Sequence, residues 1–119
     1  MKNSATGFKR ILKAFGYSYQ GLCAVCKSEA AFRQDLLACA VGLILSALFA
    51  NNATEWAVMI FSLFMILLME LVNSAIEVII DRISPEYHPL SGKAKDIGSL
   101  LVCLAFVNAI LIYGLIIFF

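Results

Sequence analysis

A stripe of polar side chains interrupts a long apolar stretch of the sequence: Glu70, Asn73, Glu77 and Asp81. On a helix of about 100° per residue these positions share one narrow face, about 16 Å long. In a membrane each ionisable group would cost on the order of 2.5–3.5 kcal/mol, and three carboxylates on one face also repel one another. Hydrogen bonding between helices accounts for Asn73 but not for the acids. We therefore expect the stripe to carry out chemistry.

Two kinds of chemistry fit such a stripe. A pair of carboxylates can hold Mg²⁺ together with phosphate oxygens, while a neighbouring carboxylate takes a proton from a hydroxyl group, which describes catalysis on a lipid head group. Carboxylates inside membrane helices also carry protons or cations. The following loop, Arg82–Asp96, contains Lys93 and Lys95, whose compact charges suit phosphate, and this favours catalysis. The sequence has no P-loop or protein-kinase motif, so a nucleotide would need another arrangement.

The composition places this stripe in a membrane protein. Of 119 residues, 62% are apolar and 14% are charged. So short a chain cannot bury this excess in its own core, which excludes a soluble monomer and a disordered chain. No dense basic stripe indicates nucleic-acid binding. The cysteines include one C-x-x-C, but no second such pair completes a zinc site, and we interpret them as structural: Cys23, Cys26, Cys39 and Cys103.

Three apolar stretches are long enough to cross a bilayer, which takes about 20 residues. The clearest is Ile97–Phe119, 23 residues without a charge. We expect a single domain, 1–119, with an all-α membrane fold. It comprises an amphipathic surface helix at about 6–28 and transmembrane helices at about 30–50, 56–81 and 97–119.

The first of these segments has apolar residues at helical spacing and basic residues on its other faces, a pattern typical of a helix lying in the membrane surface. Asn3, Ser4 or Thr6 is expected to cap it. Gly16 and Gly21 are expected to mark a bend before the first crossing. The basic residues interrupt the apolar ones, so we do not expect a secretory signal.

The distribution of Lys and Arg predicts the orientation. Six of the nine lie in the first 33 residues, three lie in the loop Arg82–Asp96, and the linker Asn51–Glu55 has none. With three crossings, all nine fall on one side, which the positive-inside rule makes cytoplasmic. The N-terminus is then inside and the C-terminus outside.

Read together, these motifs resemble the prokaryotic diacylglycerol kinase family of integral membrane enzymes. The specific element is the stripe, Glu-x-x-Asn-Ser-Ala-Ile-Glu at residues 70–77. Glu-Tyr-His at 86–88, Ser-Gly-Lys-Ala-Lys-Asp at 91–96 and Glu-Ala-Ala-Phe-Arg-Gln at 29–34 also match. The resemblance extends over nearly the whole chain.

The resemblance implies a homotrimer in the bacterial inner membrane, with active sites at the cytoplasmic surface that neighbouring subunits complete. Each site would transfer the γ-phosphoryl group of ATP to the primary hydroxyl of 1,2-diacylglycerol. The product would be phosphatidic acid, an intermediate of phospholipid biosynthesis.

The resemblance also implies roles for individual residues. Glu70 would be the general base, oriented by Asn73 and supported by Asp81. Glu29 and Glu77 would bind the Mg²⁺ that accompanies ATP. The nucleotide contacts would be Arg10, Tyr17, Glu29, Glu77, Glu86, Tyr87, His88, Lys95 and Asp96. The lipid contacts would be Ala14, Phe15, Gly16, Ser18, Tyr19, Ala31, Phe32, Arg33, Asp35, Glu70 and Ser99.

Two alternatives stay open at this point. An undecaprenol kinase of the same family would share the stripe, although the segments at 86–88 and 91–93 favour the diacylglycerol branch. A small proton or cation carrier could use the same stripe without Mg-ATP.

Overall fold

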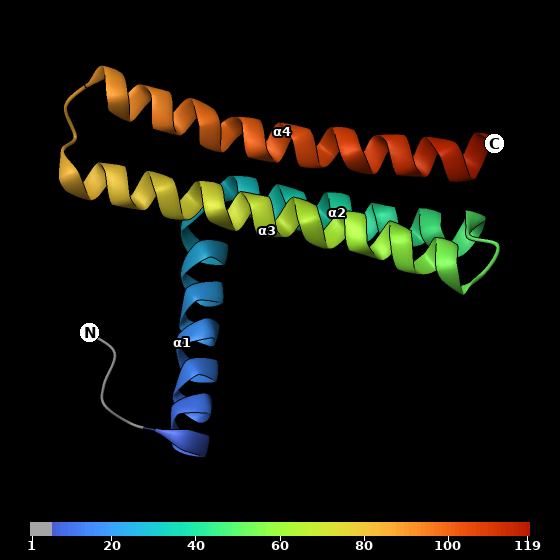
Figure 1. The fold of residues 1–119 in the computed structure, drawn as a ribbon, viewed down its shortest axis with the longest axis horizontal. Helices are drawn as coiled ribbons and strands as arrows, with labels where there is room; N and C mark the ends of the chain where they lie inside the picture. Colours follow the sequence, from blue (N-terminus) through green and yellow to red (C-terminus); the bar gives the residue numbers. More distant parts are fainter. Residues whose placement is uncertain (1–5) are drawn as a thin grey trace.

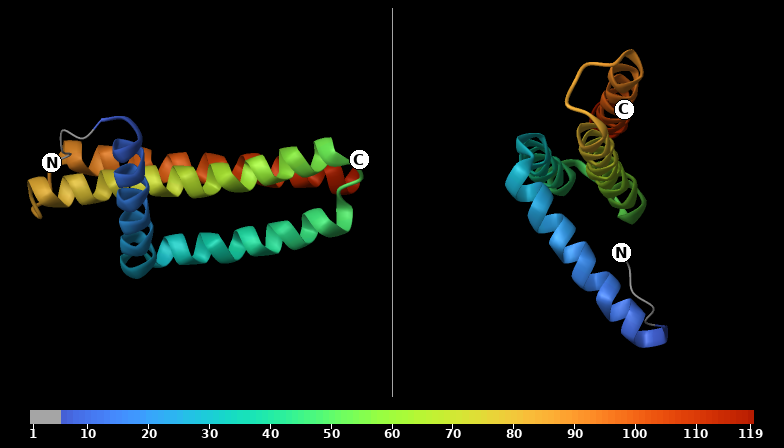
Figure 2. Two further views of the ribbon diagram at one scale, coloured as in Figure 1. Left: turned by 90° about the horizontal axis from the view of Figure 1, so that it is seen from below. Right: turned by 90° about the vertical axis from the view of Figure 1, so that its left-hand side faces the viewer.

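The structure, a computed structural model, describes residues 6–119, and all regular elements of that part are α-helices. They are α1 (Gly7–Ser28), α2 (Ala30–Phe49), α3 (Ala53–Ile83) and α4 (Pro89–Phe118). α2, α3 and α4 run side by side, and α3 packs against both of the others (Figure 1). α1 runs across their direction from the start of α2 (Figure 2).

The last three helices are long and apolar enough to cross a membrane: an 18-residue stretch of each has a mean hydropathy of 1.6 in α2, 2.2 in α3 and 2.7 in α4. Their outward faces carry many exposed apolar side chains, such as Ile44, Phe61 and Ile110, as expected of surfaces in lipid. The expected all-helical fold, with three helices long and apolar enough to span a membrane, is therefore confirmed.

The helix α3, Ala53–Ile83, extends a few residues beyond each end of the expected membrane segment at 56–81. The side chain of Asn52 accepts a hydrogen bond from the Glu55 amide (2.9 Å), and the Glu55 carboxylate accepts one from the Asn51 amide (2.9 Å). Together they satisfy amides that a helix start leaves unpaired. Because of this cap, α3 includes about one turn before the apolar stretch that hydropathy predicts.

α4 begins at Pro89, well before the predicted start of its membrane segment at 97. His88 caps the helix, because its Nδ1 accepts a hydrogen bond from the Leu90 amide (3.1 Å). Proline in the first turn loses no hydrogen bond and has the φ that a helix requires. The expectation of a loop over Arg82–Asp96 is therefore wrong, since only residues 84–88 separate α3 from α4.

α1 is continuous through Gly16 and Gly21, so the bend expected there is also wrong. The chain turns instead at Glu29, the single residue between α1 and α2. Thr6 occupies the N-cap position of α1, but its side chain makes no capping hydrogen bond. The other expected caps, Asn3 and Ser4, lie outside the described residues.

The core lies where α3 meets its two neighbours. It contains a cysteine of α2, aliphatic and sulfur-containing side chains of α3, and two alanines and a tyrosine of α4: Cys39, Met59, Leu63, Ile66, Ala105, Ala109 and Tyr113. Buried positions on α4 include Gly98, Ala105 and Ala109, which share one face and let the backbones of α3 and α4 approach closely.

A buried hydrogen-bonded cluster joins α2 to α4. The Tyr113 hydroxyl donates to the Gly42 carbonyl (3.0 Å), and the Ser46 hydroxyl donates to the same carbonyl (2.9 Å). The two hydroxyl oxygens are 3.0 Å apart. Since lipid offers no alternative partners, these groups must be paired within the protein.

Removing the Tyr113 hydroxyl should destabilise the bundle without changing its shape. We expect Tyr113→Phe to lower the free energy of unfolding by about 1 kcal/mol, the usual magnitude for a hydrogen bond between membrane helices. Tyr87→Phe is the matched control, since Tyr87 is 85% exposed. Equal stability of the two variants in detergent unfolding would contradict this role.

Candidate active site

The stripe predicted on α3 forms a connected hydrogen-bonded group. The Asn73 side-chain amide donates to Glu77 Oε1 (3.2 Å) and, at longer range, to Glu70 Oε2 (3.4 Å). Glu70 is buried, with 5% of its surface exposed, whereas Asn73 and Glu77 are half-buried. One amide thus lies between two carboxylates and partly compensates their repulsion, an arrangement that can orient a base.

A second buried acid faces this group from α2. Asp35 is 8% exposed, and its carboxyl interacts directly with that of Glu70. Its Oδ2 is buried and has no hydrogen-bond partner among the described residues. An unpaired buried carboxyl oxygen is costly unless something donates to it, so a polar ligand beside Glu70 would find an acceptor here.

A cavity of about 360 Å³ gives access to Glu70 and Asn73. It opens between the start of α2, the middle of α3 and α4, and its lining is Ala31, Glu70, Asn73, Ser99, Val102 and Cys103. The structure therefore brings the proposed base, its orienting amide and the expected lipid contact Ser99 to one place. A hydroxyl group entering this cavity would meet a carboxylate that can take its proton.

The absence of a side chain at Gly98 keeps this geometry intact. A Cβ at this position of α4 would overlap Asn73 Oδ1. A side chain here would therefore displace the Asn73 amide or hold α4 farther from α3, so the close contact at Gly98 restrains the Asn73 amide. The sequence motif contains Gly98, but its spacing could not show which side chain it faces.

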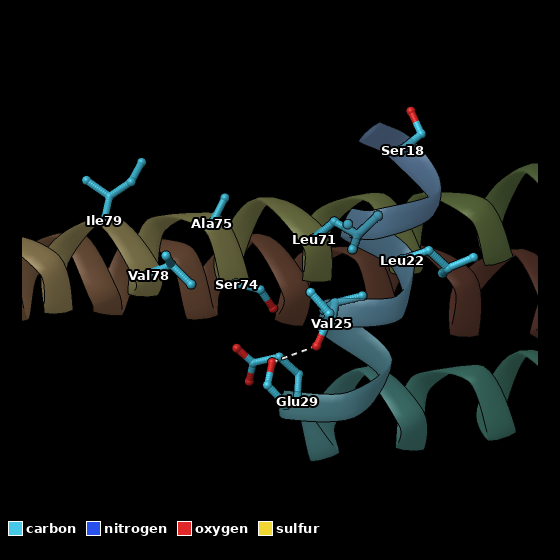
Figure 3. A pocket seen from close by; sticks show the side chains of 12 residues that line it. Ser18, Leu22, Val25, Glu29, Leu71, Ser74, Ala75, Val78 and Ile79 are labelled. Atoms are coloured by element: carbon cyan, nitrogen blue, oxygen red, sulfur yellow. Dashed lines mark hydrogen bonds between the residues drawn. The ribbon is translucent and has the colours of Figure 1, made fainter. Parts of the chain in front are cut away.

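Glu29 lies at the corner between α1 and α2 and faces a second cavity, of about 610 Å³, between α1 and α3. Ser74 of α3 faces the same cavity (Figure 3). Glu29 and Glu77 are close enough for their charges to interact. The two expected metal ligands thus lie within electrostatic range of each other, although this cavity is lined by Glu29 and not by Glu77.

The donor set at Glu29 and Glu77 suits a cation that arrives with phosphate. Among residues 6–119 no three His, Cys, Asp or Glu side chains gather as a metal-binding group. Two carboxylates leave most positions around Mg²⁺ open, and Mg²⁺ typically takes phosphate oxygens and water in such positions. These residues therefore fit Mg²⁺ bound as a nucleotide complex.

The remaining polar residues, where α3 ends and α4 begins, form a separate group. Lys95 of α4 forms an ion pair with Asp81 at the end of α3 (2.9 Å), and both side chains are largely accessible. Asp96 and the 86–88 segment are exposed beside them. His88 has an additional structural role as the cap of α4.

The expected nucleotide contacts do not all meet within one chain. Arg10 and Tyr17 lie on α1, and the start of α1 is far from the connection at residues 84–88 (Figure 1). A site that uses both regions would therefore need more than one copy of the chain or a movement of α1.

The expected lipid contacts divide into two groups. Most are exposed on α1 and at the start of α2: Ala14, Phe15, Gly16, Ser18, Tyr19 and Ala31. Phe32 is 2% exposed and packs within the chain, and the Arg33 guanidinium donates to backbone carbonyls of α1. Sequence reasoning missed these structural contacts, because both residues lie inside a motif that we interpreted as lipid-facing.

Comparison with known proteins identifies the family. The family model of prokaryotic diacylglycerol kinase matches residues 16–118. The chain belongs to this family. It is 43% identical to the diacylglycerol kinase of Escherichia coli K12 over 111 residues, which cover 93% of this chain and 91% of that protein. It is 49% identical to the Pseudomonas aeruginosa diacylglycerol kinase over 94 residues, covering 79% and 76%.

The diacylglycerol kinase of Haemophilus influenzae matches over 114 residues at 37% identity, which covers 96% of this chain and 97% of that protein. The family expected from the motifs is therefore confirmed, and its similarity includes α2, α3 and α4 in full or nearly in full. Because the relatives are kinases by name, a carrier without enzymatic activity is no longer a competitive interpretation.

Substituting Gly98 by alanine should impair catalysis by displacing Asn73. The added methyl group would occupy the place of the amide oxygen, and misplacing a catalytic group by about 1 Å can cost about 100-fold in rate. Gly114→Ala is the matched control on the same helix, since a Cβ there meets nothing within 4 Å. Equal turnover by the two variants would contradict the restraint on Asn73.

Proposed function

We propose that this protein is an ATP-dependent lipid kinase that phosphorylates 1,2-diacylglycerol to phosphatidic acid at the cytoplasmic surface of the bacterial inner membrane. The observation that carries the proposal is the Asn73 amide between Glu70 and Glu77, beside a cavity that holds the base. The names of the relatives, all diacylglycerol kinases, support the substrate.

Glu70 acts as the general base in this mechanism. It takes the proton of the primary hydroxyl, and the hydroxyl oxygen forms a bond to the γ-phosphorus while the bond to the ADP oxygen breaks. Asn73 holds the Glu70 carboxylate in place, and Asp35 offers its unpaired oxygen to a second polar group of the lipid. Phosphoryl transfer needs positioning and charge neutralisation more than covalent help.

Glu29 and Glu77 would hold the Mg²⁺ that accompanies ATP, and this cation would offset the negative charge of the phosphates. Arg10, Tyr17, Lys95 and Asp96, together with the exposed segment 86–88, contact the nucleotide. The ion pair with Asp81 holds Lys95 near the stripe. The carboxylate of Asp81 would therefore support the nucleotide site by positioning Lys95.

The depth of the two carboxylates on α3 fits two substrates of opposite solubility. Glu77 lies nearer than Glu70 to Ile83, the last residue of α3, and about 10 Å separates the two positions along the helix. The deeper acid therefore faces the lipid hydroxyl, and the shallower one faces aqueous ATP.

The functional unit is a homotrimer with composite sites. Arg10 and Tyr17 on α1 would reach a nucleotide held at residues 84–88 of a neighbouring subunit, which resolves their separation within one chain. The exposed apolar faces of α2–α4 supply the surfaces for packing. α1 lies in the cytoplasmic membrane surface, with its basic residues toward water.

The membrane orientation follows from the placement of the charges. Apart from Lys2, which lies outside the described residues, the basic residues occupy α1, the first turn of α2, the last turn of α3 and the first two turns of α4. All of these lie at one end of the bundle, which the positive-inside rule assigns to the cytoplasm. The C-terminus is then outside.

Lipid-dependent release of ADP tests this function. We expect purified protein in mixed micelles with Mg-ATP to turn over diacylglycerol, and Glu70→Gln to reduce turnover by about 1,000-fold or more while the protein stays folded. Glu55→Gln, at the opposite end of α3, is the matched control and should keep full activity.

The same assay with undecaprenol distinguishes the two branches of the family. Preference for the polyprenol would support phosphoryl transfer to a lipid hydroxyl but would contradict diacylglycerol as the substrate. Near-normal activity of Glu70→Gln would refute the base, and absence of ADP release with either lipid would refute the kinase.

A further inference from the structure

The corner between α1 and α2 consists of a single residue. α1 ends at Ser28, α2 begins at Ala30, and Glu29 has an extended backbone (φ −114°, ψ 103°). Glu29 is both the C-cap residue of α1, where its backbone N–H donates to the Val25 carbonyl, and the N-cap residue of α2, where its side chain makes no capping hydrogen bond. The direction of α1 and the position of the Glu29 carboxylate are thus set by the same few bonds.

Little side-chain packing holds α1 in its direction. Val25 is the only buried residue of α1. The contacts of α1 with the other helices are mainly contacts with α2. Figure 1 shows the rest of α1 projecting away from the bundle. Something other than a packed core must therefore fix the corner.

Arg33 supplies this restraint from the first turn of α2. Its Nη1 donates to the Cys26 carbonyl (2.8 Å) and to the Lys27 carbonyl (3.2 Å). The last carbonyls of a helix have no partner within the helix and carry its partial negative charge. A guanidinium at this end therefore stabilises the helix both by its hydrogen bonds and by its charge. One cationic side chain of α2 therefore binds the end of α1.

We propose that Arg33 is a positioning residue that clamps the α1–α2 corner and so holds Glu29 opposite Glu77. The clamp gives Arg33 a role different from the lipid contact expected from the motif, because its Nη1 is already bonded to the backbone of α1. The consequence for Mg-ATP binding rests on the function proposed above.

Two variants and a matched control test the clamp. Arg33→Gln cannot place a cation at the carbonyls, whereas Arg33→Lys can, since one nitrogen makes both bonds in the structure. Arg82→Gln removes an exposed arginine from the last turn of α3 and should leave activity unchanged. Each protein is compared in lipid micelles by hydrogen exchange and by steady-state kinetics.

The clamp predicts changes in two separate readouts. In Arg33→Gln, amide exchange at residues 25–29 should rise about tenfold or more, because both charged hydrogen bonds to the end of α1 are lost. The KM for Mg-ATP should rise about tenfold or more, as for residues that support a metal ligand, while the KM for diacylglycerol stays within about twofold. Arg33→Lys should behave nearly as the unmodified protein.

Unchanged exchange in Arg33→Gln would overturn the clamp. A rise confined to the KM for diacylglycerol would also overturn it and make Arg33 a lipid ligand. Exchange needs no catalysis, so failure of the proposed function would appear separately, as absence of turnover by the unmodified protein.

Discussion

The rest of the site depends on one amide held between two carboxylates in the second half of α3. Acids in a membrane helix are costly and repel one another, so a chain keeps Glu70 and Glu77 on one face only if something compensates them. Asn73 does so by donating to both. A single side chain thereby connects the acid suited to proton transfer with the acid suited to metal binding.

The surrounding helices keep this group in register. Gly98 lets α4 approach closely enough to restrain Asn73, and Asp35 on α2 meets Glu70 from the other side. Farther along the bundle, Tyr113 bonds to the α2 backbone and holds the outer helices at a fixed spacing. Since the interior is small and the outward faces are apolar, these few polar contacts and glycines determine the arrangement more than a large core does.

Periodicity and hydropathy were sufficient to predict the three crossings and the polar stripe, because both are local properties of the chain. They did not predict where the helices α3 and α4 themselves begin, since these starts depend on capping by Asn52 and His88 rather than on apolar content. The proximity of Asp35 to Glu70 and of Gly98 to Asn73 could not be predicted, because it depends on how helices pack. Arg33 was interpreted as a lipid contact for the same reason.

A double-mutant cycle between Asn73 and Glu77 tests the central claim that one amide couples the two acids. kcat/KM for Mg-ATP would be measured at saturating diacylglycerol for Asn73→Ala, Glu77→Gln and the double variant. If the residues act as a unit, the double variant loses little more than the worse single variant, with a coupling energy of about 1 kcal/mol or more. Losses that multiply would show that the residues act independently and would contradict the account.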